Sequence, residues 1–201
     1  MSPPAATTHA PGYTPNFFSE HSVVIDRPID EVFKMIGTES GAEQVTRLSA
    51  LCTRFDMLKR DEVNLPEGQA LQDAAVRTLK ASDDTIAAPT GTPASTAPTR
   101  RLPRQHFSMT ETIPILLGYK HDVLIVGTLT WDAAARVALY ESEADQGVLV
   151  WKLRRFEEVE NGKTRVTERI EGKCSAILRL IVQRETTKGH HAHMDAYHTL
   201  F

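Results

Sequence analysis

The stretch that decides the fold covers residues 22–36 and reads SVVIDRPIDEVFKMI. Its β-branched run at residues 23–25 predicts a strand. Pro28 comes next and suits the first turn of a helix, where the N–H that proline lacks would have no partner. The apolar positions 29, 32, 33 and 36 then recur at helical spacing, and Gly37 ends the run. The stretch therefore predicts a strand followed at once by a short helix.

A second short helix is predicted directly after the first. Ser40 and Glu43 form a capping-box pattern at its start. One apolar stripe continues from there through Val45, Leu48, Cys52 and Phe55.

The rest of the chain predicts mostly strands and one long helix. Two strands are expected at residues 58–63 and 71–79, separated by a Pro-Glu-Gly turn at residues 66–68. Five better-defined strands follow at residues 106–116, 121–131, 135–144, 147–159 and 163–172. The Asn161-Gly162 pair is a strong hairpin signal, and short connections of this kind indicate antiparallel pairing. The chain finishes with a long helix over residues 176–200.

Two segments are too poor in apolar residues to build a core. Residues 1–16 carry four prolines and no hydrophobic period, which predicts a disordered tail. Residues 81–101 consist almost wholly of small and polar residues and predict a low-complexity loop inserted into the domain. Residues 17–201 are therefore expected to form a single domain.

Composition excludes several classes of protein. The 201 residues carry a net charge of −3, which argues against nucleic-acid binding. No apolar run is long enough to predict an integral membrane segment, and the N-terminus lacks a secretory pattern. Two cysteines without an export signal indicate free thiols, so we expect a soluble, cytoplasmic protein. No phosphate-loop or dinucleotide-binding glycine pattern occurs, and no cofactor is expected.

The order of elements resembles the START-like helix-grip fold, also called the SRPBCC or polyketide cyclase/dehydrase-like superfamily. Three parts carry the resemblance: residues 22–36, the meander GTLTWDAAARVALYESE with GVLVWKLRRFEEV at residues 127–143 and 147–159, and TRVTERIEGKCSAILRLIVQ at residues 164–183. It covers residues 18–201 apart from the 81–101 loop. It implies an α+β fold in which a curved antiparallel sheet wraps around the long C-terminal helix, with two short helices after the first strand. It also implies a deep apolar cavity, in which members bind lipids, sterols or polyketides and some catalyse cyclisation or dehydration.

Strand alternation directs two glutamates to the inside of the sheet. Glu111 shares a face with apolar side chains of its strand, and so does Glu168. As desolvated carboxylates with raised pKa values, they could serve as an acid or a base. The alternative is that each pairs with an arginine such as Arg154 or Arg155, or lies near the sheet rim in water. The same alternation puts Trp151 and Arg155 on one face of their strand. Trp151 could pack in the core or line the cavity, and Arg155 could anchor an anionic head group or the buried glutamates.

One stripe of the C-terminal helix is apolar but studded with groups that form hydrogen bonds. It holds Leu180, Gln183, Thr187, His190, Met194, Tyr197 and Phe201, a mixture that suits a ligand cavity better than a plain core. Within it, His190 and Tyr197 could orient a ligand or move protons. The histidines at 190, 191, 193 and 198 do not form a recognisable metal-binding pattern, and no metal site is expected.

Together these residues predict binding of a hydrophobic small molecule that resembles a lipid, a sterol or a polyketide. The candidate binding residues are Trp151, Arg155, Leu180, Gln183, Thr187 and Met194. The first alternative is a cyclase/dehydratase-type enzyme, a lyase or isomerase without cofactor, that uses Glu111, Glu168, His190 and Tyr197 as acid and base groups. The second alternative is a protein-interaction module in which the sheet binds a partner.

Overall fold

A single antiparallel sheet dominates the computed structural model, which describes residues 10–82, 98–114 and 120–201. In these residues seven strands follow the order β1-β7-β6-β5-β4-β3-β2. Their bounds are β1 Phe17–Ile25, β2 Cys52–Pro66, β3 Thr99–Pro114, β4 Lys120–Asp132, β5 Val137–Ala144, β6 Leu149–Val159 and β7 Lys163–Lys173. All neighbouring strands are antiparallel, as the hairpin spacing predicts.

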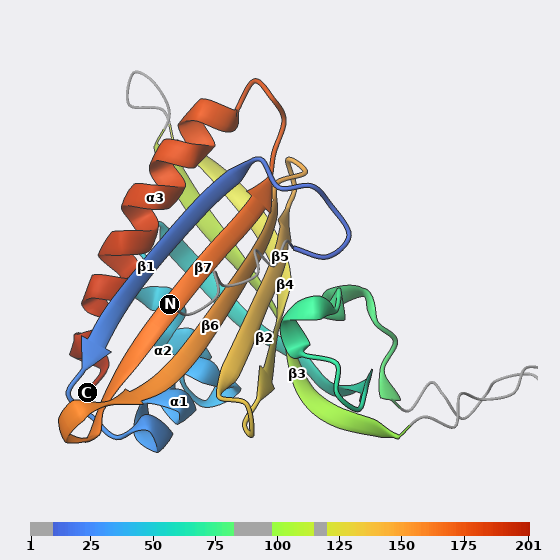
Figure 1. The fold of residues 1–201 in the computed structure, drawn as a ribbon. Coiled ribbons are helices and arrows are strands. Elements are labelled where there is room, and N and C mark those ends of the chain that lie inside the picture. The colour runs from blue at the N-terminus through green and yellow to red at the C-terminus, as the bar shows by residue number, and fades with distance from the viewer. Residues whose placement is uncertain (1–9, 83–97, 115–119) are drawn as a thin grey trace, which may run out of the picture.

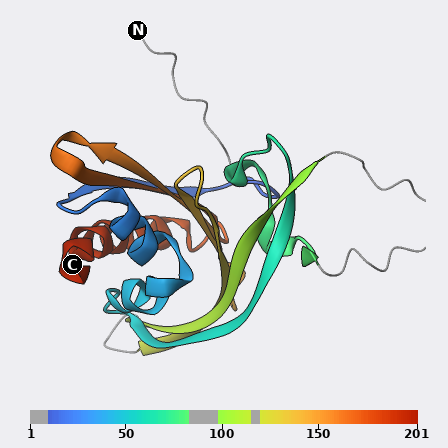
Figure 2. The same ribbon diagram turned by 90° about the horizontal axis from the view of Figure 1, so that it is seen from below.

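The helices lie on the concave face of this sheet. Between β1 and β2 come α1 (Ile29–Gly37), η1 (Glu39–Gly41) and α2 (Ala42–Arg47). The chain finishes with α3 (Arg179–Asp195), continued by η7 (Ala196–Leu200). Figure 2 shows the sheet curving around these helices, and in Figure 1 α1 and α2 cover one end of the fold. The arrangement is the predicted helix-grip fold.

The first predicted helix is confirmed. Val32, Phe33 and Ile36 are buried, and they pack with residues of the sheet and of the chain's end. The Phe33 ring meets the Phe156 ring edge-on, with centroids 5.0 Å apart. Phe33 is thus part of the core between α1 and the sheet.

The second predicted helix is shorter than its apolar stripe indicated. Helix α2 ends at Arg47, while Cys52 and Phe55 belong to strand β2, where they pair with Glu111 and Met109 of β3. The capping-box prediction is also wrong: Ser40 lies inside η1. Long-range pairing with β3 gives these residues hydrogen-bond partners that a longer helix would not provide.

The strand predicted at residues 71–79 is wrong. The segment forms two 3₁₀ turns, η2 (Leu71–Asp73) and η3 (Val76–Thr78). Its buried side chains join a second core on the convex face of the sheet, with Val63 and Trp151 among the members. The guanidinium of Arg104 donates to the carbonyl oxygens of Val76 and Leu79, at 2.6 and 2.8 Å, and so replaces the partners that a neighbouring strand would supply.

Parts of the two segments expected to lack structure are packed on the sheet. The Ala10 N–H donates to a Glu171 carboxylate oxygen at 2.6 Å, and the Tyr13 hydroxyl donates to the Glu171 carbonyl at 3.0 Å. Residues 99–101, assigned above to the inserted loop, form the start of β3 and pair with residues 64–66. Residues 1–9 and 83–97 lie outside the described part of the chain.

The hairpin and the long helix follow the sequence closely. Asn161 and Gly162 have φ angles of +64° and +71°, the positive pair that a tight hairpin turn needs. Helix α3 runs through Gly189 and starts three residues after the expected position 176. In the part of the chain that the structure describes, no helix is both long and apolar enough to cross a membrane.

Candidate functional site

Polar side chains line the concave face of the sheet beneath α3. Tyr140 of β5 is the register partner of Lys152 of β6, and Arg154 of β6 is the partner of Glu168 of β7. Strand alternation turns all four side chains toward the helix. Helix α3 and η7 add His190 and Tyr197, which are both buried.

Glu168 lies at the centre of this polar cluster. Its side chain is fully buried, and its Oε1 accepts from Arg154 Nε at 2.5 Å and from the Tyr197 hydroxyl. Its other oxygen, Oε2, lies 3.6 Å from Lys152 Nζ and 3.5 Å from His190 Nε2. Three elements of the fold, β6, β7 and the C-terminal helix, therefore meet at one carboxylate.

The charges around Glu168 keep it ionised. Burial alone would raise the pKa of Glu168, but Arg154 and Lys152 outweigh burial and hold that pKa well below its usual value. Arg154 is itself held in place, because its Nη1 donates to the carbonyl of Ile36 at 2.8 Å, in the last turn of α1. A cation at the C-terminal end of a helix also complements the helix dipole.

Lys152 is a buried amine with altered basicity. Its side chain is 14 % exposed, and its Nζ lies 4.8 Å from the centroid of the Tyr140 ring. Burial lowers the pKa of Lys152, and Glu168 opposes this only in part, so the pKa stays below its usual value. An amine whose pKa is lowered in this way loses its proton more readily, which suits it to a general base or a nucleophile.

Both inner histidines are held neutral. Burial lowers the pKa of His190, and it lowers the pKa of His193 to about 4, with Lys152 adding to the second shift. His193 Nε2 lies 2.7 Å from the Val45 carbonyl oxygen; a carbonyl only accepts, so this nitrogen carries the proton. His190 directs Nε2 toward Glu168, which leaves its Nδ1 to accept from the Ser19 hydroxyl at 2.8 Å.

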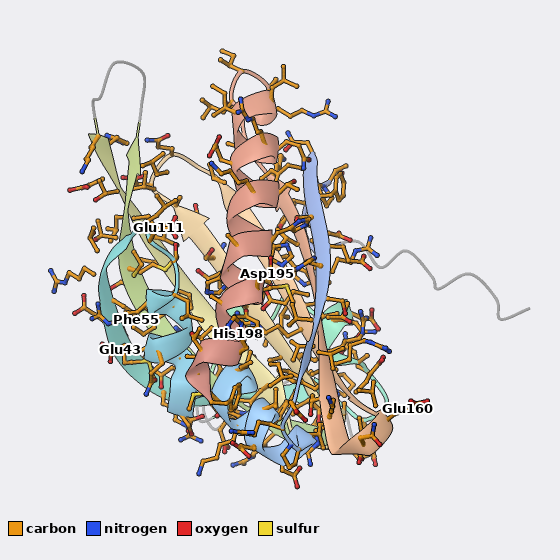
Figure 3. The ribbon with its side chains drawn as sticks, turned by 90° about the vertical axis from the view of Figure 1, so that its left-hand side faces the viewer. Glu43, Phe55, Glu111, Glu160, Asp195 and His198 are labelled. Atoms are coloured by element: carbon orange, nitrogen blue, oxygen red, sulfur yellow. The ribbon has the colours of Figure 1, made fainter. Side chains whose placement is uncertain are left out.

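Glu111 lies on the same concave face, farther along the sheet on β3. Figure 3 shows it to one side of the C-terminal helix, on which Asp195 of α3 and His198 of η7 are labelled. Burial raises the pKa of Glu111, and the charge of Lys152 offsets the rise only in part. The described residues provide no hydrogen bond or ion pair to its carboxylate. The face thus holds two carboxylates with opposite shifts: Glu168 stays ionised, and Glu111 keeps its proton more readily.

The structure brings together three of the four residues proposed for acid–base chemistry. Glu168, His190 and Tyr197 share one cluster, whereas Glu111 is coupled to it through Lys152. The alternative that Glu168 pairs with Arg154 is the arrangement present. Its pKa is consequently lowered rather than raised, so that expectation is wrong for Glu168.

The residues proposed to bind ligand from α3 have different surroundings. Met194 is fully buried in the core near α1. Gln183 forms hydrogen bonds with the Phe18 backbone on edge strand β1, and its Nε2 donates to Thr187 at 3.0 Å. Leu180 is 82 % exposed, so its expected place on the inner stripe is wrong.

The expected positions of Trp151 and Arg155 are also wrong. Trp151 packs in the convex core with Leu139 and Leu153, away from α3. Arg155 shares the face of Trp151 because the two lie four residues apart in β6. Alternation alone could not decide between the two faces of β6, since both faces are covered.

Sequence reasoning named Arg154 as a possible partner of Glu168 but missed Lys152 and His193. Lys152, Arg154 and His193 lie on the concave face, and each is next in sequence to a residue that was proposed to bind ligand. The available signal was charge: the polar positions 152 and 154 alternate with the apolar positions 151 and 153, and a buried Glu168 requires a partner.

Two surface hollows lie beside β4, and neither is lined by a residue of α3. The first has about 190 Å³ and includes His106 and Thr128; the second has about 280 Å³ and includes Leu124. Among the described residues, no group of three or more histidine, cysteine or acidic side chains could hold a metal ion.

Solved structures show the same fold at low sequence identity. TTHA0849 from Thermus thermophilus has a TM-score of 0.56 at 11 % identity, over 91 % of this chain and 95 % of that one. The Zhui aromatase/cyclase from Streptomyces sp. R1128 has a TM-score of 0.57 at 12 % identity, over 90 % and 91 %. Norcoclaurine synthase from Thalictrum flavum, in complex with dopamine and hydroxybenzaldehyde, has a TM-score of 0.53 at 12 % identity, over 91 % and 84 %.

The chain therefore has the START-like, SRPBCC-type fold that the sequence resembles. No family model matches the sequence, and no curated protein matches it. At these identities the likeness is one of fold.

Proposed function

We propose that this protein binds a hydrophobic small molecule that carries a carbonyl or anionic oxygen, on the concave side of the sheet beneath α3. The apolar part of the ligand would contact side chains such as Phe107 and Met109, which belong to an apolar cluster on the same face as Glu111. Its oxygen would meet the cations of the polar cluster. The solved aromatase/cyclase of the same fold supports this class of ligand by analogy only.

The observation that carries the proposal is the incomplete hydrogen bonding of the polar cluster. Glu168 Oε2 and His190 Nε2 are buried, yet neither has a partner at hydrogen-bond geometry. Their nearest charged contacts, at 3.5 and 3.6 Å, are longer than a good hydrogen bond. Buried polar atoms are nearly always paired in native proteins. These long contacts leave Lys152 Nζ and His190 Nε2 able to donate a shorter hydrogen bond to a ligand oxygen.

An anionic apolar dye, anilinonaphthalene sulfonate, tests the proposal. We expect the dye to bind the folded protein, and Lys152→Met to weaken binding about tenfold, because an interaction with a buried charge is lost while the side-chain volume is kept. Arg155→Met is the matched control, since Arg155 lies on the same strand but on the opposite face, and it should leave binding unchanged. Thermal melting of dye-free samples should show that both variants remain folded at the assay temperature, although Lys152→Met removes one counter-charge of Glu168 and lowers the melting temperature.

Failure of the parent protein to bind the dye would contradict the proposal. Equal loss of binding in both variants would also contradict it, because the dye would then report surface charge rather than the concave face.

A cyclase/dehydratase-type activity is the second candidate, and one observation favours it. Lys152, with its lowered pKa, and Glu111, with its raised pKa, face the same side of the sheet and interact electrostatically. Burial moves both pKa values toward neutrality, where a general acid and a general base work best. Such a pair could remove a proton next to a carbonyl and return one to a departing oxygen.

Exchange of the protons next to the carbonyl of benzylacetone in D₂O, followed by NMR, tests this activity. The parent protein should accelerate the exchange, and Lys152→Met should abolish the acceleration. If the parent protein leaves the exchange rate at the solvent value, the catalytic candidate is rejected while ligand binding stands.

A further inference from the structure

Three aliphatic side chains protrude from the turn before α3 and from the first turn of α3. Ile177 is 90 % exposed, Leu180 82 % and Ile181 64 %. On the other side of the same turns, Leu178 and Val182 pack against the core cluster that includes Phe17. At these turns only the inner side chains pack in the core, and the three outer side chains do not. We call Ile177, Leu180 and Ile181 the aliphatic knob. Large exposed apolar groups that gather in one place usually mark an interaction site.

Cations surround the aliphatic knob. Lys173, Arg179, Arg184 and Lys188 are all exposed, and the only carboxylate between residues 173 and 188 is Glu185. The described residues offer no ion pair to these four cations. The whole chain has a net charge of −3, so the charge of this basic patch is opposite in sign to the net charge of the chain.

The position of Arg179 opposes helix stability. It lies in the first turn of α3, which holds no acidic residue. The N-terminal end of a helix carries partial positive charge and favours acidic side chains there. A cation at this place has a cost for the helix, and a negatively charged partner outside the protein would offset that cost.

Two of these cations, Arg184 and Lys188, share an outward stripe of α3 with the aliphatic knob. Within α3, Leu180, Ile181, Arg184 and Lys188 lie on one outward face, because three- and four-residue spacings bring side chains together on a helix, and Ile177 lies in the turn just before the helix. In Figure 1 the start of α3 lies at the end of the fold opposite α1 and α2. The stripe thus leads from exposed aliphatic side chains at this end to exposed cations along the helix.

We infer that this stripe docks the protein onto an anionic lipid bilayer, with Ile177, Leu180 and Ile181 entering the interface and the cations binding head groups. Aliphatic side chains flanked by lysine and arginine are the combination that interfacial helices use. A protein partner fits less well, because a stable protein interface engages about 20–30 residues on each side. The inference does not depend on the ligand proposed for the concave face.

Sedimentation with lipid vesicles tests the inference on the full chain. We expect binding to vesicles of phosphatidylcholine mixed with phosphatidylserine, little binding to phosphatidylcholine alone, and weaker binding as salt is added. The triple variant Ile177→Ser, Leu180→Ser, Ile181→Ser should lower the partition coefficient about tenfold or more. The control is Leu124→Ser with Val126→Ser, two exposed apolar residues of β4, and it should bind as the parent does.

A charge variant tests the contribution of the cations separately from that of the aliphatic knob. Arg179→Gln with Arg184→Gln should remove most of the preference for phosphatidylserine and most of the salt dependence. Because all five substituted side chains are exposed, circular dichroism should show the parent fold in both variants.

Three results would overturn the inference. One is the absence of vesicle binding by the parent protein, and another is equal binding by the triple variant and the parent. The third is light scattering in which the parent protein self-associates through the knob and the triple variant is monomeric, since the stripe would then be a contact between copies of this chain.

Discussion

Replacing Glu168 by glutamine should destabilise the protein strongly, because it leaves a buried cation without its counter-charge. Glu168 is fully buried and accepts from Arg154 Nε at 2.5 Å. Removing one member of a buried ion pair costs about 3–5 kcal/mol. Lys152 can relieve part of the imbalance by losing its proton, since its pKa is already lowered. Arg154 cannot do so, and the cost therefore stays within this range.

Urea denaturation at neutral pH measures the change in the free energy of unfolding. For a chain of this size the loss corresponds to a fall in melting temperature of about 6–20 °C. Glu157→Gln is the matched control: Glu157 is 60 % exposed, and its oxygen lies 3.8 Å from Arg165. That variant should differ from the parent by about 0.5 kcal/mol or less. A loss below about 1 kcal/mol for Glu168→Gln would refute the assignment of Glu168 as a buried, ionised partner of Arg154.

The pH dependence gives a second check on the same residue. The pKa of Glu168 is lowered in the folded state, so its stabilising contribution is complete above the unfolded pKa of about 4.3. The contribution is lost as the pH falls below that value toward the folded pKa. The difference in stability between the parent protein and Glu168→Gln should therefore shrink in acid. A difference that stays constant from neutral pH to the acid limit of folding would contradict the lowered pKa.

Three further outcomes follow from burial and close contact. Phe33→Ala should cost about 3–5 kcal/mol in urea denaturation, because it empties a position that is only 3 % exposed; a loss under about 1 kcal/mol would place Phe33 outside the core. Gly172→Ala should lower stability by at least about 1–3 kcal/mol, since its Cβ would lie 1.9 Å from the Phe17 ring, whereas Gly189→Ala meets no atom within 4 Å and should raise stability by up to about 1 kcal/mol. The NMR signals of His193 should titrate near pH 4; its neutral form should give full stability above about pH 6.5 and progressively less as the pH falls toward 4, and a midpoint of 6 or higher would contradict its burial.

Local signals predicted the elements whose partners are close in sequence. Helix α1 follows from Pro28 and the apolar repeat that ends at Gly37, and the β6–β7 turn follows from Asn161-Gly162. These features depend on backbone preferences within a few residues, which the sequence displays directly. The strand prediction for residues 71–79 was wrong because the same apolar pattern fits a strand and the two 3₁₀ turns that form instead. The apolar side chains of these turns pack in the convex core.

The candidate site was predicted only from its acidic and helical sides. Alternation in β7 correctly placed Glu168 on the inner face, and the helical spacing of His190 and Tyr197 correctly placed both side chains toward it. Alternation in β6 did not decide which face of the strand points toward α3. The apolar residues 149, 151 and 153 favoured their own face, which is the convex one. Both faces of β6 pack in a core cluster, so the rule that apolar side chains point inward does not distinguish them.

The sequence by itself determined the order of the elements, the antiparallel sheet and the long C-terminal helix, because periodicity and turn residues act over short distances. Only the tertiary structure decided which side chains meet Glu168 and what charge each one carries. Those pairings join β6, β7 and α3 across the fold, and the pKa of each group depends on burial and on neighbours that no local pattern contains. The exposure of the apolar residues at the start of α3 was also decided only by the tertiary structure. Their sequence pattern is that of core residues, and only the fold shows which of them the sheet covers.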